Sequence, residues 1–446
     1  MMNKKFYILI IIATFSLNRI QLSADVLERK ETYNIQNHTG CFQEFIDYAR
    51  AYRKDMELSP EKENLRQKNI LEQFCSSLTK YDANSLEDAV YGFLAHELSL
   101  NKYDFTIINA NLTDVSGKSH DSVFLIRDLN GHLCYVVKAF RNPHDLSSKF
   151  LPEISALDFI QQLSMPGVIA INPIAFAICS NQEEEWGLLL ETAAKGRRID
   201  QFVYQLAAFT PDSKEREVFF EICQKVFRRM AESFAKLHAT KSSRSFFISM
   251  QDIDKYNKRL SEVFESCFII REMENHVSLN AFFQYVEKIK ADALNVAVFH
   301  SYWHGDAHLG NMLYDDREDI FYFIDVAKLH HSVSITGEPL LDGTMDLVRV
   351  EENLRRIAIG LLSDSEVDNL LKSFYDAYER DCSHAVSPPA FLFHKTCKKL
   401  GRLVTYSRYV EDENSIKRSL DQSVFESAVE YFENQIEFEM NSNRTL

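Results

Sequence analysis

The residues whose types and spacing could do chemistry lie between positions 299 and 326 of this 446-residue chain. Asp306 lies in an HGDxxxxN run that ends at Asn311, and Asp325 comes directly after a short apolar stretch. Each half of the segment therefore pairs a strand-like apolar stretch with an acidic residue beside it. Phosphoryl transfer requires a carboxylate that orients an attacking hydroxyl, and oxygen ligands for the Mg2+ ion on a nucleotide. These residue types in this order indicate a phosphoryl-transfer site.

Further candidate residues lie in the first half of the chain. Lys138 ends a β-rich apolar run, where an inward-pointing lysine is costly unless it has an acidic partner. The alternative is an edge-strand lysine directed to water. Glu153 lies at the start of a segment with helical periodicity, where surface glutamates are also common. Ser116 and Gly117 belong to a loop between two predicted strands, and Glu191 ends another apolar run.

The elements that must position these residues follow one another in a clear order. From 25 to about 100 the apolar spacing is helical and carries no recognisable chemistry, so we interpret it as an N-terminal helical extension. The period then changes to that of strands, and Asn130-Gly131 is a strong signal for a two-residue hairpin turn. The predicted strands are 105–115, 122–127, 133–140, 168–179 and 186–191, with one helix at 152–163. After Gly196 nearly every segment is predicted to be helical.

Composition excludes several classes of protein. Hydrophobic residues make up 46% of the chain and charged residues 26%, which is typical of a globular protein and not of a disordered one. Only 13 glycines and 9 prolines are present, which favours a helix-rich fold. The net charge of −15 argues against nucleic acid as a partner. The 8 cysteines form no CxxC pair, so a thiolate metal site or a redox motif is not expected.

The N-terminus has the pattern of a signal peptide. Lys4 and Lys5 precede the apolar run 6–17, and a cleavage site is expected after Ala24. The run is too short to span a bilayer as a helix, which takes about 20 residues. We therefore expect an exported or secreted protein with no stable membrane span after removal of this leader. The alternative is an apolar N-terminal helix that packs on the body of the protein.

The segment around Asp306 resembles the catalytic loop of the aminoglycoside phosphotransferase and choline kinase superfamily, the small-molecule relatives of protein kinases. Other segments resemble, in the family's order, the third-strand lysine segment (135–140), the helix with its paired glutamate (152–157), the lobe-connecting strand (188–191) and the segment after the metal site (337–347). The resemblance covers roughly residues 103 to 380. It implies an α+β, two-lobed protein-kinase-like fold, with a small antiparallel β lobe carrying one key helix and a larger helical lobe.

The resemblance also implies roles for individual residues. Asp306 would be the catalytic base, and Asn311 and Asp325 would bind Mg2+. The residues expected to bind ATP are Lys138, Glu153, Ser116, Gly117 and Glu191. The expected domains are a signal peptide (1–24), the extension (25–100), a nucleotide-binding N-lobe (101–192) and a C-lobe (193–446) with the catalytic loop, metal and acceptor sites.

The function that follows from the resemblance is an ATP- and Mg2+-dependent phosphotransferase that moves the γ-phosphoryl group to a hydroxyl of a small-molecule acceptor. The acidic composition mildly favours a cationic acceptor. The alternative is an exported, non-catalytic kinase-like binding or effector protein. The leader and the single glycine of the 116–122 loop favour this alternative, whereas the intact set Asp306, Asn311 and Asp325 counts against it.

Overall fold

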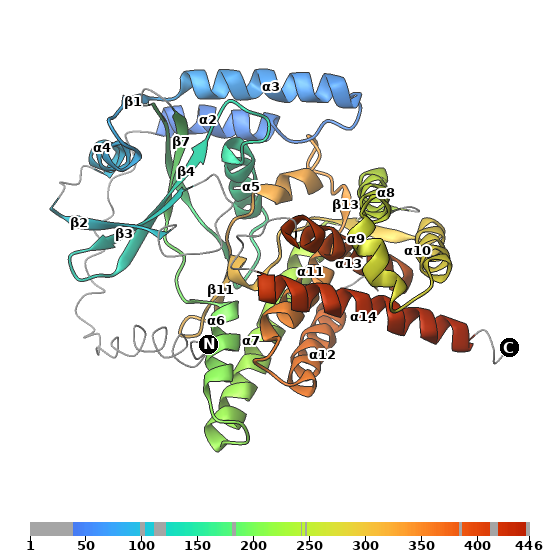
Figure 1. The fold of residues 1–446 in the computed structure, drawn as a ribbon. Helices are drawn as coiled ribbons and strands as arrows, with labels where there is room; N and C mark the ends of the chain where they lie inside the picture. The colour runs from blue at the N-terminus through green and yellow to red at the C-terminus, as the bar shows by residue number, and fades with distance from the viewer. Residues whose placement is uncertain are drawn as a thin grey trace.

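The computed structural model describes residues 39–98, 103–110, 122–180, 184–241, 243–245, 248–382, 386–410 and 418–442. The expected signal peptide and the candidate residues Ser116 and Gly117 lie outside these ranges. The described residues form a sheet-containing lobe and a larger helical lobe (Figure 1). The prediction of an α+β, two-lobed architecture is thereby confirmed.

The smaller lobe is built on a six-stranded sheet with the order β1-β6-β7-β4-β3-β2. The strands are β1 (Lys80–Asp82), β2 (Phe105–Asn109), β3 (Ser122–Asp128), β4 (Leu133–Arg141), β6 (Pro173–Ser180) and β7 (Glu185–Thr192). All neighbours pair antiparallel except β1 and β6, which are parallel. Gly131, in the turn predicted between β3 and β4, has a φ of 81°, a conformation that favours glycine.

The predicted strand 168–179 is two strands that belong to different sheets. β5 (Val168–Ala170) pairs with β12 (Ile320–Phe323) of the helical lobe, whereas β6 pairs with β7 in the smaller lobe. Pro173, at the start of β6, lies at the change of direction. A proline lacks the N–H that a strand interior would need, so the division falls where the chain can leave one sheet for another.

Helix α5 (Phe150–Gln162) is the helix of the smaller lobe that carries Glu153. The segment interpreted as an extension packs against it: α2 (Thr39–Ala51) crosses α5 in contact with it, and α3 (Pro60–Ser77) lies beside α2 (Figure 1). Arg50 and Arg53 both donate to the carboxylate of Asp158 on α5, at 3.1 and 3.2 Å. A further helix of this segment, α4 (Leu86–Leu98), packs near the sheet edge formed by β1. The segment therefore fixes the position of α5.

The segment that connects β7 to the helical lobe passes close to the backbone of β11. Gly196 has a φ of 86°, and a Cβ at this position would collide with the backbone of Tyr314. β8 (Arg197–Arg198) then pairs with β11 (Met312–Asp315), which forms a hairpin with β12 (Ile320–Phe323). We call it the catalytic hairpin, after the role predicted for the residues that flank it. The four-stranded sheet β5-β12-β11-β8 thus connects the hairpin to β5, which lies between α5 and β6, and to β8, which follows β7.

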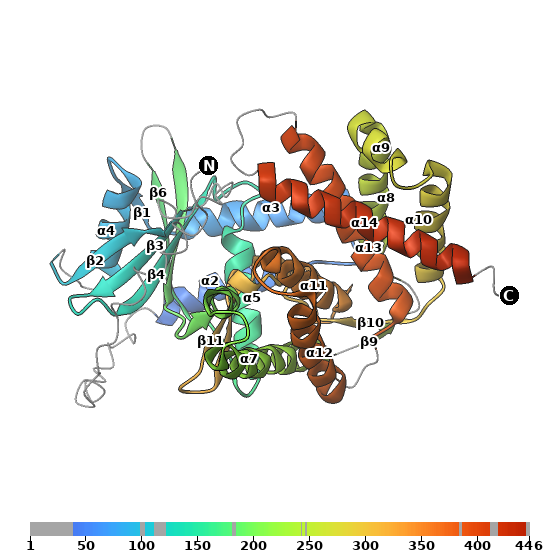
Figure 2. The ribbon, with the colours of Figure 1, turned by 60° about the horizontal axis from the view of Figure 1, so that its bottom comes forward.

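The described residues of the helical lobe contribute to two large hydrophobic cores. The first is shared with α5 and includes α7 (Lys214–Ala239) and α12 (Asp364–Asp381). The second lies under α8 (Met250–Glu265), α9 (Cys267–Glu274), α10 (Leu279–Leu294), α13 (Pro388–Val410) and α14 (Arg418–Ser442). Two further helices, α6 (Ile199–Ala208) and α11 (Thr344–Ala358), flank the catalytic hairpin. Figure 2 shows α11 between this hairpin and α13. None of the helices in the described ranges is long and apolar enough to cross a membrane.

Candidate active site

The loop that carries Asp306 is shaped by a glycine and a buried acid. Gly305 has a φ of 78°, and a Cβ there would lie 2.7 Å from the Cβ of Lys328, so only glycine fits without displacement. Asp346, in the first turn of α11, is fully buried and accepts the backbone N–H groups of His304 at 2.6 Å and Gly305 at 2.9 Å. The His304 ring accepts the N–H of Asp306 and bonds the carbonyl of Ile324. These bonds hold the loop against the hairpin.

The Asp306 carboxylate is held between two cations. Lys328 Nζ lies 2.8 Å from Oδ2, and Arg349 Nη1 lies 3.0 Å from Oδ1. Burial alone would raise the pKa of Asp306, but Lys328 and Arg349 outweigh it and hold this pKa well below its usual range. The carboxylate is therefore ionised at neutral pH, and 28% of its side chain remains exposed. It can accept a hydrogen bond from a hydroxyl that enters the site.

Asn311 and Asp325 are brought to the same place by the two halves of the hairpin. Asn311 is the last residue of the 3-10 turn Leu309–Asn311, directly before β11. Its Nδ2 donates to the carbonyl of Asp306 at 3.2 Å. Ile324, the residue before Asp325, donates its N–H to the carbonyl of Asn311 at 3.0 Å. Asp325 has a φ of 53°, a strained conformation for a residue other than glycine, and 37% of its side chain is exposed.

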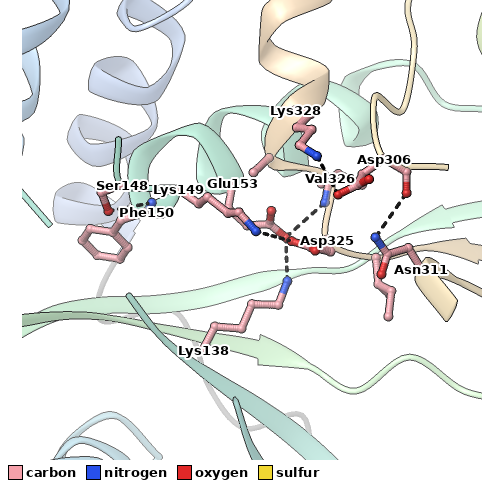
Figure 3. Close-up of polar contacts among 12 residues, drawn as sticks. Lys138, Ser148, Lys149, Phe150, Glu153, Asp306, Asn311, Asp325, Val326 and Lys328 are labelled. Atoms are coloured by element: carbon pink, nitrogen blue, oxygen red, sulfur yellow. Dashed lines mark hydrogen bonds and ion pairs between the residues drawn. The ribbon is translucent and has the colours of Figure 1, made fainter. Parts of the chain in front are cut away.

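Lys138, Glu153 and Glu191 form a buried cluster from three elements of the smaller lobe. Lys138 Nζ lies 2.5 Å from Glu153 Oε1 and 3.2 Å from Glu191 Oε1. Glu153 also accepts the N–H of Val326, the residue after Asp325, at 3.3 Å (Figure 3). Burial lowers the pKa of Lys138, but the carboxylates Glu153, Glu191 and Asp325 outweigh it and raise the pKa. The cluster thus connects α5 to the segment that follows the second strand of the hairpin.

Glu191 makes the stability of the protein depend on pH. Burial raises the pKa of Glu191 from 4.5 to about 7, against the attraction of Lys138. Between these values the folded state holds a proton that the unfolded state has lost, so the free energy of unfolding falls as pH rises, by up to about 1.4 kcal/mol per pH unit. Urea unfolding at pH 5 and pH 7 should therefore show a smaller pH dependence for Glu191→Gln than for the wild type. Glu87→Gln, at an exposed position of α4, is the matched control and should retain the wild-type slope. An unchanged slope in Glu191→Gln would contradict this assignment.

The structure brings together all six sequence-derived candidates that it describes, in the region between the two lobes. Figure 3 labels each of them except Glu191. Lys138 has its acidic partner and is not a solvent-directed edge lysine, and Glu153 is fully buried rather than on a helix surface. Asp346 is fully buried and braces the loop through the N–H of His304.

Two cations of the site, Lys328 and Arg349, were missed from the sequence. Lys328 lies three residues after Asp325, so its place close to the hairpin was a usable signal. Arg349 comes from α11 and reaches Asp306 only through the tertiary fold. Charge neutralisation of Asp306 therefore could not be predicted in full from sequence spacing.

The donor set fits a magnesium ion that is also bound by nucleotide phosphates. Asn311 and Asp325 supply an amide and a carboxylate oxygen, the ligand types that Mg2+ prefers, and this ion usually keeps several waters or phosphate oxygens. Among the described residues, no group of three or more His, Cys, Asp and Glu side chains could hold a metal by itself. The site is therefore suited to a metal that enters together with a substrate.

Residues 111–328 match the sequence profile of the phosphotransferase enzyme family. This match covers the segment that contains the Lys138 cluster and the catalytic hairpin, and it confirms the resemblance noted in the sequence. No curated protein sequence is significantly similar to the chain.

Several solved structures resemble the protein at low sequence identity. A glucosamine kinase has 11% identity and a TM-score of 0.46, covering 79% of this chain and 83% of its own. An amicoumacin kinase in complex with AMP-PNP and Ca2+ has 12% identity and a TM-score of 0.44, covering 79% and 94%. An ethanolamine kinase of Plasmodium vivax has 10% identity and a TM-score of 0.41, covering 81% and 94%.

Proposed function

From the match of residues 111–328 to the phosphotransferase enzyme family, we propose that this protein transfers the γ-phosphoryl group of ATP to a hydroxyl of a small molecule. One observation carries the proposal: Glu153 joins Lys138 to the residue after Asp325, while Asn311 joins the residue before Asp325 to Asp306. The Lys138 ammonium, the Asn311 amide and the carboxylates of Asp325 and Asp306 thus face one region between the lobes (Figure 3). This arrangement supports the tasks of phosphate binding, metal binding and hydroxyl orientation that phosphoryl transfer requires.

Each residue of the candidate site has a task in the proposed reaction. Lys138, oriented by Glu153, binds the α- and β-phosphates, while Asn311 and Asp325 hold Mg2+, which offsets the charge on the transferred phosphoryl group. Asp306 accepts the hydrogen bond of the acceptor hydroxyl and directs its oxygen at the γ-phosphorus. Lys328 and Arg349 are positioning residues, because they fix the orientation of the Asp306 carboxylate.

Nucleotide binding provides the first test. Calorimetry with ATP should show binding that is strengthened by Mg2+, and this strengthening should be lost in Asp325→Ala because a carboxylate ligand is removed. Asp316→Ala is the matched control, since Asp316 is an exposed aspartate in the turn of the same hairpin. Equal dependence on Mg2+ in Asp325→Ala and wild type would contradict the role of Asp325.

A turnover assay distinguishes the proposed enzyme from the alternative function, a non-catalytic, exported binding or effector protein. ADP release should be measured with amino alcohols, amino sugars and sugar phosphates as acceptors, with Asp306→Asn as the inactive reference. Transfer to any of these acceptors would exclude the alternative. Nucleotide binding without transfer to any acceptor, by contrast, would favour it.

A further inference from the structure

A group of basic side chains lies in the helical lobe around Arg349, the residue that contacts Asp306. Apart from Arg349, its members have no task in the reaction as described so far. We call Lys255, Arg259, Arg349, Lys398 and Arg402 the basic cluster. Lys255 and Arg259 are four residues apart on α8, and Lys398 and Arg402 are four residues apart on α13, so each pair shares one helix face. α13 packs against both α8 and α11, and Arg259 donates to the carbonyl of Cys397 at 3.0 Å.

The cluster is distinct from the proposed nucleotide phosphate site. Both ribbon views place α8 and α13 in the helical lobe, across the molecule from β4, the strand of Lys138 (Figures 1 and 2). Arg349, on α11, connects the cluster to the catalytic loop through its contact with Asp306. The cluster therefore lies in the helical lobe, away from Lys138, and is linked to Asp306 through Arg349.

The two lysines of the cluster lack a neutralising partner. Within the described ranges, neither Lys255 nor Lys398 has a carboxylate at ion-pair distance, and Arg349 Nε is buried without an acceptor. Two other lysines of the same helix α13 each pair with a carboxylate. Lys395 lies 2.9 Å from Glu351, and Lys399 lies 3.2 Å from Glu352. The fold thus neutralises the α13 lysines next to the cluster, but not Lys398 within it.

This arrangement is electrostatically unfavourable in the absence of an anion. Burial lowers the pKa of Lys398 well below its usual range, and the neighbouring cations Arg402, Arg349, Arg259 and Lys255 lower it further. Burial, Arg349 and Arg259 likewise lower the pKa of Lys255, with Asp252 as an opposing acid. Like charges gathered in a partly buried place destabilise a protein, and they are found where a ligand of opposite charge binds.

We propose that the acceptor is a phosphorylated small alcohol, whose phosphate binds to Lys255 and Lys398 beside Arg349 while its free hydroxyl lies at Asp306. A phosphate monoester fits better than a single carboxylate, because its two charges and several acceptor oxygens match ammonium and guanidinium donors from two helices. The proposal rests on the proposed function and defines its substrate class. The proposed acceptor is anionic, whereas the acidic composition of the chain mildly favoured a cationic one.

The reaction balances with this acceptor. The acceptor hydroxyl oxygen forms a bond to the γ-phosphorus, and the bond between that phosphorus and the β–γ bridging oxygen breaks. ADP leaves with the electron pair, and the hydroxyl proton passes to Asp306 and then to water. The products are ADP and a bisphosphorylated alcohol.

Binding of a defined probe tests the proposal without relying on turnover. Calorimetry should compare glucose 6-phosphate, inorganic phosphate and glucose on the full-length protein. We expect glucose 6-phosphate and phosphate to bind and glucose not to bind, and Lys398→Gln to weaken phosphate binding about 10- to 100-fold. Lys258→Gln is the matched control, because Lys258 lies on an exposed face of α8 and loses the same charge. Loss of phosphate binding in Lys138→Met but not in Lys398→Gln would place the phosphate at the nucleotide site and overturn the proposal.

Thermal unfolding provides a second, independent readout. Without phosphate, Lys398→Gln should melt at the same temperature as the wild type or higher, because repulsion within the cluster is reduced. Added phosphate should raise the melting temperature of the wild type and of Lys258→Gln more than that of Lys398→Gln. A lower melting temperature for Lys398→Gln, together with an equal response to phosphate, would show a merely structural lysine.

The two proposals fail in different ways. Transfer to neutral or cationic alcohols, with no binding of phosphorylated probes, would leave the phosphotransferase function in place and overturn the acceptor class. Phosphate binding that depends on Lys398, with no binding of ATP, would support the anion site and contradict the phosphotransferase function.

Discussion

Asp306→Asn is expected to slow phosphoryl transfer about a thousandfold, the middle of the range for loss of a catalytic acid–base group. The amide keeps the size of the side chain but loses the negative charge that Lys328 and Arg349 neutralise, and it cannot accept the proton of the acceptor hydroxyl. Steady-state release of ADP, measured with saturating acceptor, gives the rate. The affinity for ATP should change little, because the contacts of Lys138 and Asp325 are left in place.

The variant Lys328→Met distinguishes the role of the Asp306 carboxylate from that of the lysine that orients it. Lys328 contacts Asp306 but is 42% exposed, so its removal should slow transfer far less than loss of the carboxylate. Because the pKa of Asp306 lies well below its usual range, the rate in the wild type should not fall between pH 8 and pH 5 through protonation of this residue. A rate within tenfold of the wild type for Asp306→Asn would remove Asp306 from the reaction.

Lys138→Met is expected to reduce the free energy of unfolding at pH 7.5 by about 3–5 kcal/mol, the cost of breaking a buried ion pair by removal of one partner. The substitution leaves the carboxylates of Glu153 and Glu191 buried together without their cation. Chemical denaturation followed by circular dichroism measures the change. ATP binding should also weaken, because the ammonium proposed for the phosphates is gone.

A second variant separates charge repulsion from lost packing. In Lys138→Met/Glu191→Gln one of the two unpaired carboxylates is neutral, so part of the stability should return, while ATP binding should stay weak. Lowering the pH to 5 should likewise reduce the difference between Lys138→Met and wild type, because buried carboxylates without a cation take up protons more readily. If the double variant is no more stable than Lys138→Met at either pH, electrostatic pairing is not what Lys138 contributes.

The sequence predicted best those site residues that lie close together along the chain. Asp306 and Asn311 are close in sequence, and Asp325 comes two residues after the return strand of the same hairpin, so their proximity was predictable from local turns and strands. Lys138 and Glu153 are separated by 15 residues and lie on different elements, and their pairing was implied by family resemblance before the structure showed it. The predicted strand 168–179 was wrong in its continuity, because apolar periodicity does not show which sheet each half joins.

By itself, the sequence determined the two-lobed architecture, the order of its elements and the local spacing of the acidic hairpin, because these depend on periodicity and short-range turns. Only the tertiary structure decided which charges meet across the chain. It placed Arg349 on Asp306, directed Asp346 into the catalytic loop, and gathered lysines and arginines of α8, α11 and α13 into one cluster. Electrostatic interaction depends on distance and burial in three dimensions, whereas a net charge of −15 is a sum over the whole chain. The acceptor proposed from the cluster therefore has the opposite charge to the one that this sum favoured.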